Sequence, residues 1–208
     1  MPSRQETCQI GYVDTQELPE DRDGFRFRGG SSVIDLPATL RARLSPAPLE
    51  LLGTPADLVR WLVSAGMAES VPEATPDDLL TARALREAIY TLAGRKGGAK
   101  IKEARQTLNE IAAGSPAVPQ FKGDGTAVLT GSVSALLVTL AREAVQLFGS
   151  DLAELVRQCQ APVCTLYFLD TSRKGDRRWC SMSACGNKAK AASFRRRQRR
   201  SLKVSKRK

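Results

Sequence analysis

Residues 159–188 read CQAPVCTLYFLDTSRKGDRRWCSMSACGNK and hold four of the five cysteines of the chain. These cysteines form two C-x4-C pairs that are separated by fifteen residues. Two close pairs joined by a hairpin-length insert are what a four-coordinate zinc site requires, because each pair can hold one side of the metal. The chain has no histidine, which excludes a mixed Cys/His site. The spacing therefore predicts a zinc ion (Zn2+) bound by Cys159, Cys164, Cys180 and Cys185.

Two other interpretations of these cysteines are a pair of disulfide bonds and four unrelated buried thiols. Disulfides are typical of secreted proteins and rare in reducing compartments. Residues 1–14 (MPSRQETCQIGYVD) lack the apolar stretch of a signal peptide, so we expect a cytoplasmic protein. No run approaches the roughly 18 apolar residues of a membrane span, so we expect no membrane partner. These expectations favour zinc over disulfides.

The insert between the cysteine pairs has the pattern of a β-hairpin. In residues 165–170 (TLYFLD), leucine and phenylalanine alternate with tyrosine and leucine in a β-prone run. Residues 171–176 (TSRKGD) have turn chemistry, and residues 177–180 are expected to return as the second strand. From Gly186 onward the sequence favours a helix. The prediction is a small treble-clef-like module whose folding depends on its metal.

The run RRWCSMSACGNKAKA, together with the upstream C-x4-C and LYFLDTS, resembles the CGNR zinc finger family. The Cys-Gly-Asn-Arg run of that family stands here as Cys185, Gly186, Asn187 and Lys188. Lysine in place of arginine keeps the positive charge but not the planar, forked donor geometry. The resemblance implies four cysteine ligands and a DNA-binding role in bacterial transcription regulation.

Positive charge is concentrated at the C-terminal end of the chain. Fifteen of the 32 lysines and arginines lie from Thr171 onward, where Asp176 is the single acid, so this end carries +14 and the rest −4. This asymmetry indicates a nucleic-acid-binding end, although a solvated charge run is the alternative. Duplex DNA is the expected partner. The candidate nucleic-acid contacts come from the insert and the basic helix: Arg177, Arg178, Asn187, Lys188, Lys190, Arg195, Arg196 and Arg199.

Two residues of this region have two possible roles each. We expect Trp179 to pack over the hairpin, with stacking on a base as the alternative. Asn187 can cap the basic helix or, alternatively, read an adenine edge.

Residues 24–150 are predicted to form a mainly helical domain with short β elements, after a flexible segment at 1–23. The sequence Thr-Pro-x-Asp at 54–57 and again at 75–78 places an N-cap, a proline and an acid where helices begin. Further helices are expected over 99–113, over 132–148, and from Ser150 or Asp151 to Cys159.

Three segments of this domain resemble the ABATE domain, which commonly precedes the CGNR finger: FRFRGGSSVIDLPATL, a helix ending in WLVSAG, and ALREAIYTL. The resemblance covers roughly residues 24–150 and implies a stress-induced transcription regulator. It leaves open whether the domain binds a small-molecule effector or forms a homodimer.

Catalysis is not expected. Without histidine the usual general base is absent, and a four-thiolate zinc site has no open position. The run GRKGGAK has no apolar strand before it, so it does not indicate a phosphate-binding loop.

We therefore predict a mainly α, two-domain, zinc-containing DNA-binding regulator. Residues 24–150 sense or dimerise, 151–200 form a finger with a basic C-terminal helix, and 201–208 form a basic tail. The alternatives are an RNA-binding or ribosome-associated zinc protein, and an enzyme that acts on a small molecule through residues 24–150.

Overall fold

A computed structural model of the chain describes residues 20–95 and 97–205, with side chains of the last helix as far as residue 198. The described residues are mainly helical, with four short two-stranded antiparallel sheets, as predicted. The α-helices are α1 Ser32–Asp35, α2 Pro55–Ser64, α3 Pro76–Ala93, α4 Ala99–Ala112, α5 Val133–Phe148 and α6 Asn187–Ser205. The paired strands are β1 Asp21–Arg22 with β2 Phe25–Arg26, β3 Leu40–Arg41 with β4 Leu49–Glu50, β5 Val118–Phe121 with β6 Ala127–Thr130, and β7 Val156–Gln158 with β8 Tyr167–Leu169.

The two Thr-Pro-x-Asp signals begin α2 and α3 as predicted. Thr54 accepts a hydrogen bond from the Asp57 backbone N–H, and the Asp57 carboxylate accepts one from the Thr54 N–H, at 3.3 and 2.9 Å. Thr75 and Asp78 repeat this reciprocal pattern at the start of α3. Such capping boxes satisfy backbone donors that the first helical turn leaves without a partner.

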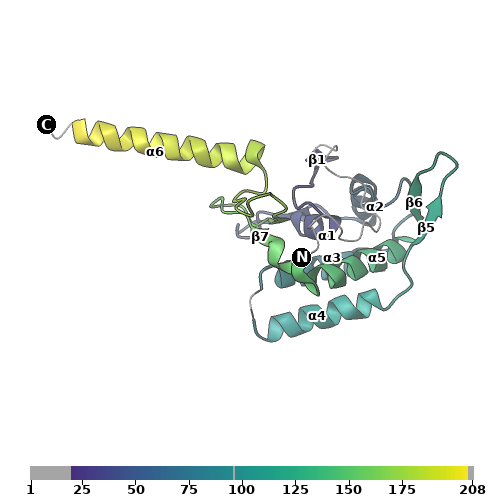
Figure 1. The fold of residues 1–208 in the computed structure, drawn as a ribbon. Coiled ribbons are helices and arrows are strands. Elements are labelled where there is room, and N and C mark those ends of the chain that lie inside the picture. Colours follow the sequence, from purple (N-terminus) through teal and green to yellow (C-terminus); the bar gives the residue numbers. More distant parts are fainter. Residues whose placement is uncertain (1–19, 96, 206–208) are drawn as a thin grey trace, which may run out of the picture.

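Helices α3, α4 and α5 pack side by side and form the main body of the molecule, with α1 and α2 on one side (Figure 1). Helix α6 projects away from this body (Figure 1). The core between the helices is built from fully buried apolar side chains, the largest being Trp61, Ile34, Leu36, Leu52, Leu58, Leu62, Leu85, Ile89, Leu136, Leu137 and Leu140.

Part of the predicted flexible segment 1–23 is structured. Residues 1–19 lie outside the described part of the chain, but Asp21–Arg22 forms β1 and pairs with β2. The Phe27 N–H donates to the Glu20 carbonyl at 2.7 Å, which extends this pairing by one hydrogen bond. The hairpin forms because Asp23 and Gly24 adopt positive φ, which a tight turn requires.

The C-terminal finger joins the body through β8, whose side chains alternate between two cores. Tyr167 and Leu169 pack against the main core, and the Tyr167 ring meets the Tyr90 ring edge to face at 5.3 Å. Leu166 and Phe168 point the other way, into a second core with the cysteines and Ala38. The predicted alternation of residues 165–170 is therefore confirmed, and the finger shares a strand with the body.

Two predicted elements of this region are wrong. The strand that pairs with β8 is β7, with Val156 opposite Leu169, whereas no strand is assigned to 177–180. The helix expected from Ser150 is a short 3-10 helix, η2 Asp151–Leu155, which leads into β7. One edge of β8 pairs with β7, and 177–180 is held by side-chain contacts with Asp170 and from Arg177 and by a backbone hydrogen bond from the Gln160 N–H to the Arg178 carbonyl.

A buried carboxylate holds the loop on which β8 docks. Asp35, at the end of α1, accepts hydrogen bonds from the backbone N–H groups of Gly29 and Arg28 at 2.7 and 2.8 Å. The Gly29 carbonyl in turn accepts from the Leu169 N–H of β8 at 2.8 Å. Burial raises the pKa of Asp35 to about 7, despite the opposing effects of these hydrogen bonds and of Arg22.

This pKa predicts a stability that falls as the pH rises. Between pH 5 and 7 the folded state holds the Asp35 proton and the unfolded state, with a pKa near 4, does not. The free energy of unfolding should therefore fall by on the order of 2 kcal/mol between pH 5 and pH 8. Asp35→Asn keeps the accepting oxygen and should flatten this dependence in urea titrations of both proteins. An unchanged pH dependence in the variant would contradict the assignment and would point to Glu143, another carboxyl whose pKa is raised by burial.

Candidate metal centre and nucleic-acid interface

The structure brings the four predicted ligands together. The sulfur atoms of Cys159, Cys164, Cys180 and Cys185 all lie within 4.8 Å of one another. The Cys164 and Cys180 Sγ atoms are 3.8 Å apart, and the Cys180 and Cys185 Sγ atoms are 3.7 Å apart. A tetrahedral ion with metal–sulfur distances of about 2.3 Å has its ligands about 3.8 Å apart. The cluster therefore has the spacing that such an ion needs.

The protonation chemistry of the cluster also favours a cation. Hydrogen bonds from Cys164 and Cys180 lower the pKa of the Cys159 thiol. The same interactions with Cys159, together with burial, raise the pKa of Cys164 and Cys180. Because each thiolate opposes ionisation of its neighbours, four thiolates can exist together only around a positive charge. No disulfide links these four residues.

Backbone hydrogen bonds fix both cysteine pairs. The Cys159 N–H donates to the Leu166 carbonyl and the Cys164 N–H to the Ala161 carbonyl, both at 2.9 Å, which closes the first turn. The Gln160 N–H donates to the Arg178 carbonyl at 3.0 Å and ties the first pair to the second. These contacts help to hold the four sulfur atoms near one another.

Asp170 closes the loop between the two pairs. Its carboxylate accepts hydrogen bonds from Ser172 and from the Arg177 N–H, the latter at 2.9 Å. Burial alone would raise the pKa of Asp170, but these hydrogen bonds outweigh burial and lower it. The carboxylate therefore stays ionised and keeps the loop folded at neutral pH.

The helical segment begins inside the second cysteine pair, with Ser181 as its N-cap, rather than at Asn187. The Ser181 hydroxyl accepts from the Ala184 N–H at 3.3 Å and donates to the Glu20 carboxylate at 2.6 Å. A π-helical turn, η3 Met182–Gly186, then leads directly into α6. Asn187 already has helical backbone angles and is exposed, so the predicted capping role is wrong.

Gly186 packs closely against two neighbouring side chains, so a larger residue would have to displace them. A Cβ atom at this position would lie 2.6 Å from the Met182 sulfur and 3.2 Å from the Trp179 ring. Glycine therefore allows the start of α6 to approach the tryptophan closely. This gives a packing reason for the Cys-Gly-Asn run.

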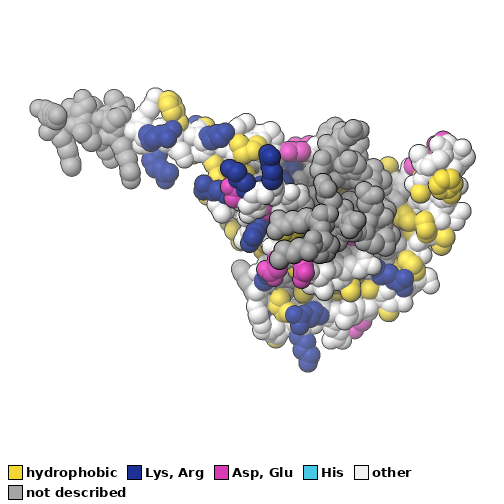
Figure 2. Space-filling view, viewed as in Figure 1, with side chains coloured by type: hydrophobic (Ala, Val, Ile, Leu, Met, Phe, Trp, Pro, Cys, Tyr) yellow, Lys and Arg dark blue, Asp and Glu magenta, His cyan; other side chains and the backbone are white. Residues whose placement is uncertain are grey.

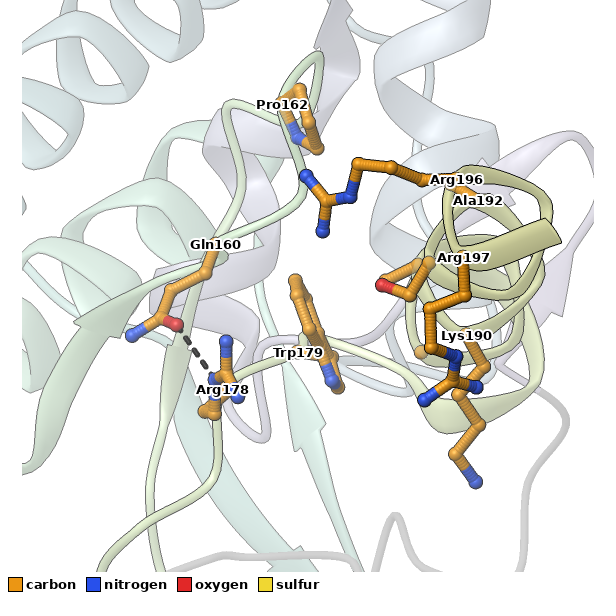
Figure 3. Close-up of a pocket in the computed structure, with 11 residues that line it drawn as sticks. Gln160, Pro162, Arg178, Trp179, Lys190, Ala192, Arg196 and Arg197 are labelled. Carbon is orange, nitrogen blue, oxygen red and sulfur yellow. Dashed lines mark hydrogen bonds between the residues drawn. The ribbon is translucent and has the colours of Figure 1, made fainter. Parts of the chain in front are cut away.

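A groove of about 680 Å³ runs between the first cysteine pair and α6, with Trp179 in its centre (Figure 3). Its lining contains four cationic side chains and no acid. The lining residues are Gln160, Pro162, Arg178, Trp179, Gly186, Ala189, Lys190, Ala192, Ser193, Arg196 and Arg197. Figure 2 shows Lys and Arg side chains gathered over the finger and the start of α6.

Three of the predicted nucleic-acid contacts line this groove: Arg178, Lys190 and Arg196. Lys188 and Arg195 are exposed but are not among its lining residues. Asn187 is exposed as well, and the side chain of Arg199 lies outside the described residues.

Arg177 has a structural role in the finger. Its guanidinium donates to the carbonyls of Trp179 and Cys180, the first at 2.9 Å, and lies 4.6 Å from the centre of the Phe168 ring. These contacts engage the guanidinium within the finger's own backbone and core. Arg177 is therefore less available to a phosphate than the groove arginines.

Trp179 packs on the finger core, and its stacking on a base stays a prediction. The ring is half-buried against the finger core, as expected, and also lines the groove.

The sequence reasoning missed Arg197, Gln160 and Pro162 as parts of this surface. For Arg197 a signal was present, because it follows Lys190 by seven residues, or about two helical turns. Gln160 and Pro162 reach the groove through the fold of the first cysteine pair, which local sequence does not show.

The Ser181 contacts predict an unequal effect of two serine substitutions. Ser181→Ala removes the N-cap and a partly buried hydrogen bond to Glu20, so it should lower the free energy of unfolding by about 1–2 kcal/mol. Ser183→Ala is the comparison, because exposed Ser183 contacts the Ser181 hydroxyl at 2.8 Å and the same carboxylate at 3.3 Å but is not the residue whose side chain caps the helix. Equal losses in urea denaturation of the two variants would contradict the capping role.

In the part of the chain that the structure describes, no helix combines the length and the apolar character needed to cross a membrane.

Comparison with known protein families identifies both parts of the chain. Residues 30–151 match the ABATE family model, described as "Putative stress-induced transcription regulator", and residues 156–198 match the CGNR zinc finger model. A search of curated proteins found no match. The two matches agree with the architecture that the sequence predicted. The first match spans more than half of this chain. The chain therefore belongs to the ABATE family, and its ABATE domain is followed by a CGNR zinc finger.

Proposed function

We propose that this protein is a transcription regulator whose finger binds one zinc ion and whose basic surface binds duplex DNA. The observation that carries the proposal is the acid-free groove beside α6, lined by Arg178, Lys190, Arg196 and Arg197. A surface of this kind neutralises phosphates and releases their counterions, which supplies most of the affinity of non-specific DNA binding.

The metal in this proposal is structural. Four sulfur donors at tetrahedral spacing suit zinc and leave no coordination position for a substrate. A bound zinc ion neutralises thiolate charge and holds the two cysteine pairs together. The proposal therefore assigns no catalytic role to the protein.

Helix α6 is the element proposed to contact the DNA. It has nineteen residues and is therefore about 28 Å long. An α-helix fits the major groove of B-DNA, and a projecting helix can enter it without a clash from the body (Figure 1). Lys188 and Arg195 are exposed outside the Trp179 groove, so cations on more than one face of α6 can reach phosphates.

The ABATE domain is proposed to regulate this binding, either by taking a small-molecule effector or by forming a homodimer. Strand β8 supports such a role, because it contacts the main core with Tyr167 and the metal-cluster core with Phe168. A shift of the body at Tyr90 or Gly29 would act directly on this strand.

The metal proposal predicts one zinc per chain by elemental analysis of the purified protein. Cys180→Ser with Cys185→Ser should lose the zinc and unfold the finger, because two thiolates cannot hold it. Cys8→Ser is the matched control and should keep one zinc per chain, since the four clustered sulfurs belong to other cysteines. Absence of zinc from the unmodified protein, or full retention in the double variant, would reject zinc at this site.

The charge proposal predicts a strong salt dependence of duplex binding. Five to seven phosphate contacts should give a slope of log affinity against log salt of roughly −5 to −6. Arg196→Ala with Arg197→Ala should weaken binding and flatten the slope by about 2, measured by fluorescence anisotropy. Lys100→Ala with Lys102→Ala removes the same charge from exposed positions of α4 and should have a much smaller effect. A slope near zero, or equal effects of both pairs, would refute the interface.

The type of nucleic acid is tested by competition between duplex DNA and duplex RNA of the same sequence. We expect the DNA to compete at lower concentration. Stronger competition by the RNA would favour the RNA-binding or ribosome-associated alternative.

A further inference from the structure

The Trp179 groove has features that a duplex backbone does not use. Figure 3 shows the Trp179 ring standing between Arg178 and α6. The Arg178 guanidinium lies 5.1 Å from the centre of this ring and is held by a 2.8 Å hydrogen bond from its Nε to the Gln160 side chain. The Trp179 ring therefore has one neighbouring cation, Arg178, that a hydrogen bond holds in position.

One wall of the groove contains four small residues: Gly186, which ends η3, and Ala189, Ala192 and Ser193 of α6. Their short side chains leave the space beside Trp179 open, which gives the groove its volume of about 680 Å³. Cationic side chains of Lys190, Arg196 and Arg197 also line it. The groove thus combines an aromatic ring, an open space beside it, and positive charge without any lining acid.

These features specify the chemistry of a ligand. A flat aromatic group can stack on Trp179, and an attached anion can pair with the surrounding cations. A nucleotide has both parts. In a paired duplex each base is stacked between its neighbours and presents only its edges, so the groove suits a base that is outside the stack.

We propose that the Trp179 groove binds one unpaired nucleotide of a nucleic-acid chain, with its base stacked on Trp179. This inference rests on the proposed function and adds a preference to it. The protein binds DNA with a single-stranded or unpaired segment more tightly than fully paired DNA. Arg178 and the cations of α6 hold the phosphates on either side of the stacked base.

Tryptophan fluorescence tests this directly, because the chain has two tryptophans and Trp61 is completely buried in the main core. The zinc-loaded full chain is titrated with a 12-nucleotide single strand, with its blunt duplex, and with a mononucleotide. Only the single strand should strongly quench the emission at low concentration. The mononucleotide should need at least about 100-fold more, because it lacks the neighbouring phosphates. Equal potency of the mononucleotide would assign the groove to a free nucleotide and overturn the proposal.

Two variants separate stacking from folding. Trp179→Ala should reduce the ratio of single-strand to duplex affinity by about 5- to 150-fold, the range for loss of one base–aromatic stack. Trp179→Phe keeps an aromatic face and should retain much of the ratio. Because Trp179 also packs on the finger core, zinc content is measured in both variants. An unchanged ratio in a zinc-loaded Trp179→Ala protein would overturn the proposal.

The same titrations distinguish failure of the Trp179 site from failure of the proposed function. Salt-dependent binding of both polymers without quenching, and without a preference for the single strand, would remove the Trp179 site and leave the proposed function standing. Failure of both polymers to bind would reject the proposed function and this site with it.

Discussion

The two-sided packing of β8 is the constraint on which the rest of the structure depends. Successive side chains of a strand point to opposite faces, so Tyr167 and Phe168 cannot enter the same core. One joins the helical body and the other joins the cysteine cluster. The Leu169 N–H then fixes the strand to the Gly29 loop at 2.8 Å. These contacts fix the position of the finger on the body. The position of the finger in turn sets the direction of α6.

Carboxylates pair with arginines in the helical body but are absent from the lining of the Trp179 groove. Arg86 is buried and pairs with Glu50 at 2.6 Å, and Arg43 pairs with Glu87 at 2.7 Å. Burial alone would raise the pKa of both carboxyls, but the arginines outweigh it and lower the pKa. Among the residues that line the Trp179 groove there is no such carboxylate. No carboxylate of the groove lining therefore competes with a phosphate for these cations.

Local patterns predicted the parts of this protein that depend on neighbouring residues. The Thr-Pro-x-Asp helix starts, the alternation in 165–170 and the clustering of four cysteines all follow from short-range spacing. The pairing of β7 with β8 was missed because strand pairing is non-local and β7 has only three residues. Ser181 was missed as the cap because a π-helical turn moves the helical start back from Asn187. The groove itself arises from the angle between α6 and the first cysteine pair, which only tertiary structure sets.

The attachment of α6 to the cysteine cluster has a thermodynamic consequence. Its sequence places arginines four residues apart, at 195 and 199 and at 196 and 200, and like charges at this spacing destabilise a helix. An isolated helix of this length is marginal in water, and its costly step is formation of the first turn. Ser181 and the π-helical turn beside Cys185 supply that first turn. If the proposed DNA binding occurs, phosphates along α6 would reduce the remaining repulsion, and binding would then stabilise the helix. The cysteine cluster is thus the nucleus of the helix as well as its anchor.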